Sequence, residues 1–286
     1  IAGALRHFDI ALRTSFSAYA ILIPVMTSAA AEAPIARRIR ALVERAPPWR
    51  NDFFEHLIQH GPSAATNVYL MRGLLRANVP GDQFLAQAAF SRLFRDNQVD
   101  LAWQLYDSIV GARAGSEVPL RDGGFDNVPL FPPFDWQLSA EPSLSGIRNA
   151  RDGAAENVAL YAYFERPGAG EVARQMLRLA PGSYRLAATA ANVGQRDRAQ
   201  LTVRIACVSG ASLASVTAPA ADASGRRFEQ GFAVPAGCTA QWLVIEAAQR
   251  GEIGEANPWI DDITISRGSG PAVAGPSAPT RNSIGE

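Results

Sequence analysis

Histidine is the side chain that most readily exchanges protons near neutral pH, and the sequence contains three, His7, His56 and His60. His56 and His60 stand four residues apart, so on a helix both would project from one face and could share a metal ion. The residues between them do not include the glutamate that completes the HExxH zinc-protease motif. We therefore interpret this pair as part of a solvated or packed helix face.

Other catalytic motifs are missing from the sequence. It contains no Gly-x-Ser-x-Gly nucleophile turn, no phosphate-binding P-loop and no Rossmann glycine pattern. A glycosidase needs two carboxylates beside the bond that is broken. Nothing in the sequence shows which of its 27 acidic residues converge. We expect a protein that is not an enzyme.

The two cysteines, Cys207 and Cys238, both lie in a region of β-type sequence, where they can sit on neighbouring strands. A disulfide between them would stabilise the fold by about 3–4 kcal/mol. The alternative is two unlinked buried thiols. We expect the disulfide, and with it an oxidising compartment, so that the protein is periplasmic or extracellular.

The charge of the chain indicates which classes of molecule the protein is expected to bind. The formal net charge is zero, with 12 Arg against 9 acidic residues up to residue 115 (+3) and 15 Arg against 18 after it (−3). This contrast is too small to predict nucleic-acid binding or direct membrane binding, so we expect membrane contact only through a partner. All 27 basic residues are Arg, which together with abundant Ala indicates a GC-rich bacterial genome.

The elements that must position these groups are of two kinds, and the first is helical. Up to residue 115, apolar residues recur three and four apart, the pattern of amphipathic helices. The helices should break at Pro34, Pro47-Pro48, Gly61-Pro62 and Pro80-Gly81. This predicts about six helices in antiparallel pairs, a helical repeat-like domain over residues 1–115.

An uncharged run over residues 15–31 lies within this region. It is shorter than the roughly 20 apolar residues that a membrane span needs, and hydroxyl side chains interrupt it. We expect a buried helix pair that is broken near Pro24.

The second kind of element is the β-strand. From residue 116 to 267, short alternating or apolar runs bounded by Gly, Pro, Ser and Asp predict an antiparallel β-sandwich. The runs are 185–191, 199–208, 228–234, 241–247 and 259–265. Residues 268–286 are rich in Gly, Pro, Ser and Ala and predict a flexible tail.

Segments in both regions resemble known families. Residues 84–97 and 99–110 look like a tetratricopeptide-type hairpin, with small Ala88, Ala89 and Ala102 at the helix contact, although no copy recurs at a period of about 34 residues. The β region resembles carbohydrate-binding-module jelly rolls, which are galactose-binding-like sandwiches. Four segments carry that resemblance: Gly123-Gly124-Phe125-Asp126-Asn127, Phe134-Asp135-Trp136, Leu179-Ala180-Pro181-Gly182-Ser183-Tyr184 and Trp259-Ile260-Asp261-Asp262-Ile263-Thr264-Ile265.

The jelly-roll resemblance implies a structural calcium site that joins the first and last strands. Its ligands would be Asp126, which stands where the family usually has Glu, and Asp261. Strand alternation places Asp261 on the same face as Ile263, toward the core, where a carboxylate needs a cation or hydrogen-bond donors. The alternative is an Asp that accepts from backbone amides or pairs with Arg.

The resemblance also implies sugar binding by exposed aromatic rings. Tyr161 and Tyr163 fall on one face by alternation, and Trp259 is a further candidate. Trp136 and Trp242 are expected in the core. The alternative for the tyrosines is packing within the sheet.

Two functions from different classes fit these features. The first is a non-catalytic extracytoplasmic binding or scaffold protein, whose helical part docks a protein partner and whose sandwich binds polysaccharide. The second is a structural subunit of a larger envelope or membrane-associated complex, without a glycan ligand.

Overall fold

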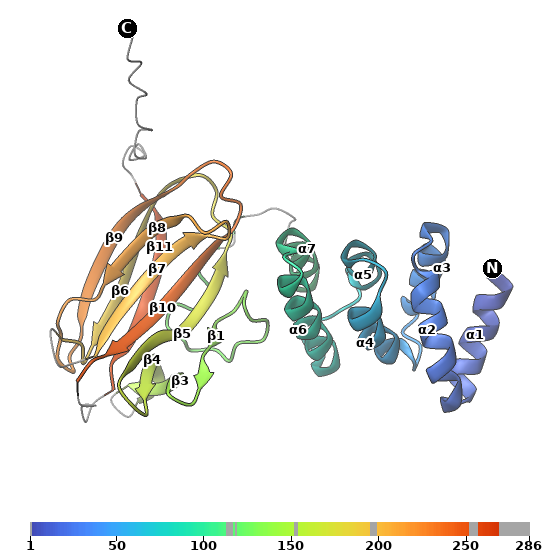
Figure 1. Ribbon diagram of the computed structural model, residues 1–286, viewed down its shortest axis with the longest axis horizontal. Coiled ribbons are helices and arrows are strands. Elements are labelled where there is room, and N and C mark those ends of the chain that lie inside the picture. The colour runs from blue at the N-terminus through green and yellow to red at the C-terminus, as the bar shows by residue number, and fades with distance from the viewer. Residues whose placement is uncertain are drawn as a thin grey trace, which may run out of the picture. The chain divides into compact units, whose positions relative to one another are not determined.

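The computed structural model of the chain describes residues 2–112, 117, 119–151, 154–194, 199–251 and 257–268 (Figure 1). The chain divides into two compact units, Ile1–Ser116 with Leu130–Pro132, and Glu117–Pro129 with Pro133–Glu286. Leu130–Pro132 therefore belongs to the helical unit, whereas sequence analysis assigned it to the sandwich. The ring of Phe131 explains this, because it packs edge-on against Phe90 at a centroid distance of 6.3 Å. The predicted tail, 268–286, lies outside the described residues except for Gly268.

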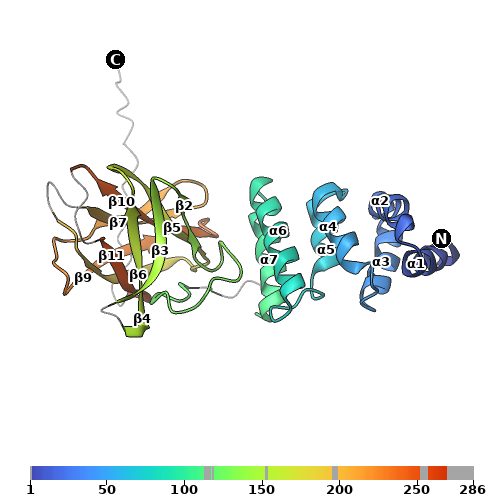
Figure 2. The ribbon, with the colours of Figure 1, turned by 90° about the horizontal axis from the view of Figure 1, so that it is seen from below.

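All helices of the described residues lie in the first unit. It contains α1 (Ala2–Thr14), a short 3₁₀ helix η1 (Phe16–Ala18), α2 (Tyr19–Ala29), α3 (Ala33–Val43), α4 (Arg50–His60), α5 (Ala64–Met71), α6 (Pro80–Arg95) and α7 (Val99–Val110). Helices that are two apart in chain order pack on each other, as α2 does on α4 and α4 does on α6. Figures 1 and 2 show the result, a row of antiparallel helices in chain order.

The predicted helix breaks are confirmed. Pro34 and Pro80 lie in the first turns of α3 and α6, where a missing N–H is tolerated. Gly61-Pro62 separates α4 from α5. The core between the helices is aromatic, with Trp49, Phe53, Phe54, Phe90 and Tyr106 all fully buried.

The prediction for residues 15–31 is wrong in two respects. Pro24 lies inside α2 and does not break it. The helix tolerates the missing hydrogen bond because Ile23 and Met26 beside it are buried, each contributing about 1.5–3 kcal/mol. The segment is also only partly buried, since 67% of Ile21 is exposed. Within the described ranges, no helix is long and apolar enough to cross a bilayer.

The second unit is a sandwich of two antiparallel sheets. Its strands are β1 (Gln137–Leu138), β2 (Ala140–Glu141), β3 (Leu144–Arg151), β4 (Ala154–Phe164), β5 (Gly168–Leu177), β6 (Gly182–Ala191), β7 (Gln200–Cys207), β8 (Ser212–Thr217), β9 (Arg226–Val234), β10 (Gln241–Gln249) and β11 (Trp259–Arg267). In the described residues, one sheet has the order β1-β5-β10-β7-β8 and the other β2-β3-β4-β11-β6-β9. The predicted fold class is therefore correct.

Alternation along the strands builds the sandwich core. Leu201, Val203 and Ile205 of β7 project inward from one sheet, and Leu186 and Ala188 of β6 project inward from the other. All of these side chains belong to one continuous apolar cluster between the sheets. This packing fixes which residues of each strand face outward and are available to a ligand.

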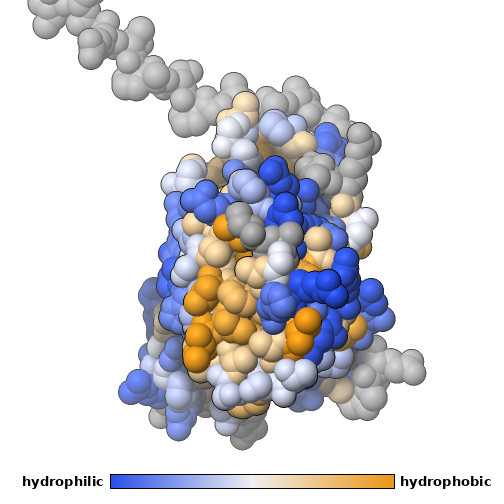
Figure 3. All heavy atoms as spheres, turned by 90° about the vertical axis from the view of Figure 1, so that its right-hand side faces the viewer, coloured by the Kyte–Doolittle hydropathy of each residue, from blue (hydrophilic) through white to orange (hydrophobic). Residues whose placement is uncertain are grey.

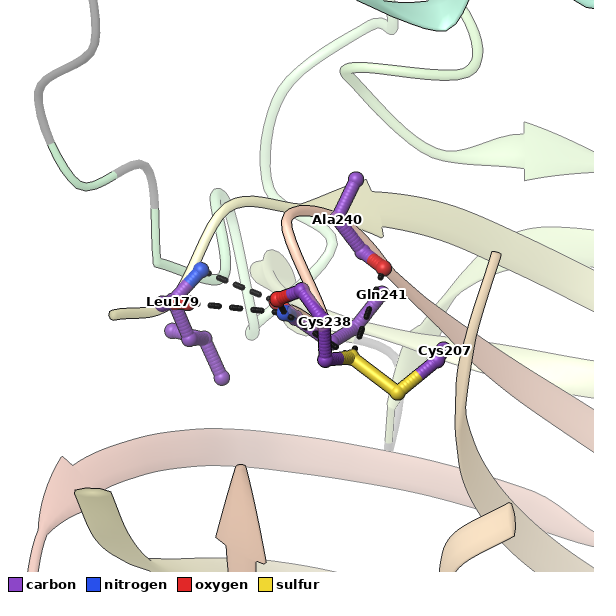
Figure 4. Close-up of a disulfide and its surroundings, with 5 residues drawn as sticks. All are labelled: Leu179, Cys207, Cys238, Ala240 and Gln241. Carbon is purple, nitrogen blue, oxygen red and sulfur yellow. Dashed lines mark hydrogen bonds between the residues drawn. A yellow bond between two sulfur atoms is a disulfide. The ribbon is translucent and has the colours of Figure 1, made fainter. Parts of the chain in front are cut away.

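The structure contains the Cys207–Cys238 disulfide, with the two Cα atoms 5.5 Å apart (Figure 4). Gln241, also fully buried, lies beside it. The Gln241 amide accepts from the backbone N–H of Leu179 at 2.9 Å and donates to the carbonyl of Cys238 at 2.8 Å. The disulfide and the amide thus fasten the loops at one end of the sandwich to each other.

Candidate functional site

The outer side of the six-stranded sheet carries the predicted tyrosines. Residues that lie directly opposite one another on neighbouring strands share a face. One such row crosses four strands and consists of Ile147, Tyr161, Trp259 and Ala191. The adjacent residues Leu160 and Ile260 belong to the core cluster, so the row faces outward.

The accessible part of this side is a surface that we call the tyrosine face, formed by Ser145, Ile147, Asn149, Tyr161 and Tyr163. Tyr163 is 48% exposed and Ile147 is 44% exposed, while Tyr161 is partly buried between them and Trp259. Ser145 lies opposite Tyr163 and supplies a hydroxyl beside its ring. The structure thus places Tyr161 and Tyr163 on one face.

Trp259, the third predicted ligand residue, lies next to Tyr161 but is only 4% exposed. The guanidinium of Arg151 covers its ring at 4.5 Å from the centroid. On its edge, a Cβ at Gly225 would lie 3.0 Å from the indole, so glycine is needed for this close approach. Trp259 therefore supports Tyr161 from the side and presents no open ring surface.

The expectation that Trp242 lies in the core is wrong. Leu243, Ile245 and Ala247 of β10 are the residues that reach the core, so alternation turns Trp242 outward. There the guanidinium of Arg174 lies 5.0 Å from the ring centroid. The apolar run 242–245 hid this alternation, because a continuous run reads as buried on both faces.

The two predicted calcium ligands also come together, although not on the predicted face. Asp262 has a left-handed backbone (φ 50°) and introduces an irregularity into β11. Ile260 and Ile263 both reach the core as a result, and Asp261 lies opposite Thr189 on the outer side. The expectation that Asp261 shares the face of Ile263 is therefore wrong.

Asp261 is 2% exposed and is held by two donors. Its Oδ2 accepts from Nη1 of Arg151 at 2.9 Å, and its Oδ1 accepts from the N–H of Asp262 at 2.7 Å. Burial, the largest cause, together with the carboxylates of Asp262 and Asp126, raises the pKa of Asp261 to about 6 against the opposing effect of these two donors. The negative charge of Asp261 is therefore only partly compensated.

Asp126 approaches the same place from the start of the sandwich. A Cβ at Gly124 would lie 2.8 Å from Oδ2 of Asp126 and 3.8 Å from Oδ1 of Asp261, so both oxygens border one point. These are the hard oxygen donors that Ca²⁺ prefers. Among the described residues no group of three or more acidic, His or Cys side chains could hold a metal ion. Further ligands would be carbonyl oxygens or water.

Besides the approach of Asp126 to Asp261, a set of hydrogen bonds joins the start of the sandwich unit to the end of β11. Oε1 of Glu117 accepts from Nη2 of Arg267 at 2.5 Å and from the hydroxyl of Tyr184 at 2.9 Å. The backbone N–H of Ala180 donates to the same oxygen at 3.1 Å. These hydrogen bonds, led by that of Ala180, lower the pKa of Glu117.

A pocket of about 390 Å³ opens at the sandwich edge, between β1, β2, β3 and β5. Its lining includes Ser139, Ser143, Glu141 and Glu171. Glu171 pairs with Arg174 at 3.4 Å. None of the predicted site residues lines this pocket.

No family model and no curated protein matches the chain. Solved structures do match the sandwich. A family 61 carbohydrate-binding module in complex with β-1,4-galactotriose is 14% identical, with a TM-score of 0.40, and the match covers 54% of this chain and 100% of that one. A structure described as a family 4 module is 20% identical, with a TM-score of 0.38 and coverage of 52% and 99%. A family 22 module of Clostridium thermocellum is 13% identical, with a TM-score of 0.34 and coverage of 47% and 87%. These three structural neighbours are carbohydrate-binding modules.

Proposed function

We propose that the protein is a non-catalytic extracytoplasmic binding protein whose sandwich binds a polysaccharide through the tyrosine face. One observation carries this proposal: Tyr163, Tyr161 and Ile147 form an outward apolar strip on a sheet whose own core lies on the other side. Aromatic rings combine a large apolar surface with a polar edge, which suits the apolar faces and hydroxyl rims of sugars.

The surroundings of the strip supply the polar contacts that such a ligand needs. Ser145 and Asn149 flank the tyrosines on β3, opposite Tyr163 and Ala159. Their hydroxyl and amide groups both donate and accept hydrogen bonds.

The test is affinity electrophoresis of the full chain in gels that contain neutral or acidic polysaccharides. We expect at least one polysaccharide to retard the protein, and Tyr163→Ala to lose most of that retardation. Tyr69→Ala is the matched control, because Tyr69 is 41% exposed but belongs to α5 of the helical unit. Unretarded wild-type protein in every gel would overturn the proposal.

The helical unit supports the second half of the proposal, docking of a protein partner. Its first helices expose a group of large apolar side chains that we call the apolar end face: Ile10, Phe16, Ile21 and Val25. Phe16 is 84% exposed. Figure 3 looks onto this end, and apolar residues gather on it inside a polar rim. Surfaces of this kind mark protein interaction sites.

Two further parts of the proposal concern location and metal. The Cys207–Cys238 disulfide supports a periplasmic or extracellular location, because disulfides persist in oxidising compartments. The convergence of Asp126 and Asp261 supports a structural calcium ion that would hold the start of the sandwich to β11.

The apolar end face also favours the alternative function, a structural subunit of a larger envelope complex. In that case the helices would assemble with a partner while the tyrosine face binds no glycan. The electrophoresis experiment separates the two functions, since only the first predicts retardation that depends on Tyr163.

A further inference from the structure

The helical unit carries a pair of histidines that the proposed function does not use. His56 and His60 lie one turn apart on α4, and their ring centroids are 4.7 Å apart. His60 is exposed and His56 is half-buried. The pair is therefore accessible from solvent.

The ring of His56 is oriented by a neighbouring helix. Its Nδ1 lies 3.0 Å from Oγ1 of Thr27, a buried side chain of α2. When Nδ1 carries the proton and donates it to this hydroxyl, Nε2 keeps a free lone pair. A neutral imidazole held by an outer hydrogen bond is the form that ligates metal ions.

We propose that His56 and His60 bind one divalent transition-metal ion, each through one imidazole nitrogen. Zinc–nitrogen bonds are about 2.0–2.1 Å long, so two imidazoles on one ion hold their ring centres roughly 5 Å apart. The observed separation of the centroids already matches this requirement. Imidazole suits Zn²⁺, Ni²⁺ and Cu²⁺, whereas Ca²⁺ and Mg²⁺ prefer oxygen ligands.

Two ligands for this ion come from the described residues. Within the part of the chain that the structure describes, no third His, Cys, Asp or Glu completes a metal-binding group around the pair. The remaining coordination positions are therefore filled by water, as in open metal sites that exchange a ligand. The ion would bridge two turns of α4 and stabilise its C-terminal end.

The test is isothermal titration of the full chain with ZnCl₂ near neutral pH, in excess calcium so that carboxylate sites are occupied. We expect one zinc ion per chain, and loss of this binding in His60→Gln, an exposed position where the change leaves the core intact. Thr27→Val should weaken binding by roughly tenfold or more, because it removes the outer hydrogen bond.

The matched control is His7→Gln, which removes the third histidine of the chain, on α1. It should bind zinc as the wild type does. Circular dichroism of each variant without metal shows whether the helices remain folded. Wild-type protein that binds no zinc, or a folded His60→Gln that binds it unchanged, would overturn the proposal.

Discussion

Glu117 shows how one carboxylate stabilises the sandwich. It receives hydrogen bonds from the N–H of Ala180, the hydroxyl of Tyr184 and the guanidinium of Arg267, and they favour its ionised form. Its folded-state pKa is therefore lower than the unfolded value of about 4.3. A group of this kind stabilises the fold fully above the unfolded pKa, and the contribution is lost as the pH falls through the folded pKa.

The prediction is that Glu117→Gln lowers the free energy of unfolding near neutral pH and reduces its decline below about pH 4.3. Urea unfolding of both proteins at several pH values measures this. Glu229→Gln is the comparison, since Glu229 pairs with Arg185 at 2.6 Å on the surface and receives no such set of donors from the described residues. Parallel pH curves for wild type and Glu117→Gln would contradict the role given to Glu117.

Asp261 shows which parts of a site a sequence can reveal. The family resemblance pointed to Asp126 and Asp261, and the structure places an oxygen of each within 4 Å of where a Cβ at Gly124 would lie. The ion pair with Arg151 could not be assigned, because 110 residues separate the partners and Arg is the only basic residue type besides His. The face of Asp261 was also missed, since a left-handed residue such as Asp262 leaves no mark in an alternation pattern.

The calcium site remains a prediction that stability measurements can test. Ca²⁺ bound only by the folded sandwich would stabilise it by about 2.7 kcal/mol at a hundredfold excess over Kd. We expect a chelator to lower the melting temperature of the wild-type sandwich and Asp126→Asn to lose this sensitivity. Asp122→Asn is a poor control because Asp122 accepts from the N–H groups of Asp126 and Asn127, so Asp135→Asn serves instead. Identical wild-type melting in chelator and in calcium would exclude the site.

Individual elements were predicted unequally well. The five strands found from alternation or from short apolar runs, β6, β7, β9, β10 and β11, all contribute side chains to the core cluster, and the helix ends were marked by proline and glycine. Strands β3, β4 and β5 were not delimited, because glycines and alanines in them weaken the contrast between inner and outer residues. The close approach of Gly123 to β11, where its carbonyl accepts from the N–H of Ile263, also depends on contacts distant in sequence.

The disulfide joins the end of β7 to the turn before β10, and removing it should have a measurable effect. Replacing Cys207 and Cys238 together by Ala should lower the free energy of unfolding by about 3–4 kcal/mol, because the unfolded chain regains the entropy of the open loop. Urea unfolding of the double variant beside the wild type, each with and without reductant, measures this. The wild type in reductant should approach the variant, and a variant as stable as the oxidised wild type would contradict the prediction.

At the scale of the whole molecule, the two units carry different surfaces. The helical unit presents the apolar end face, and the sandwich presents the tyrosine face, where polar side chains flank the rings. The spacing of apolar residues predicts this division into two units, since a helical period of 3.6 residues gives way to a strand period of 2 residues. The exception is Leu130–Pro132, which lies within the β-type part of the sequence but belongs to the helical unit. Its side chains are apolar and could pack in either core, so the sequence does not show which core they join.

Glu117 and Arg267 also determine how the sandwich would respond to mechanical load. These residues stand at its two chain ends and are joined directly, and Gly123 and Ile263 are joined just inside them. A pulling force applied to both ends would therefore act first on these few bonds and open them one after another. Because Arg267 also lies opposite Tyr184 in the pairing of β11 with β6, the load would pass from these bonds directly into the six-stranded sheet that carries the tyrosine face.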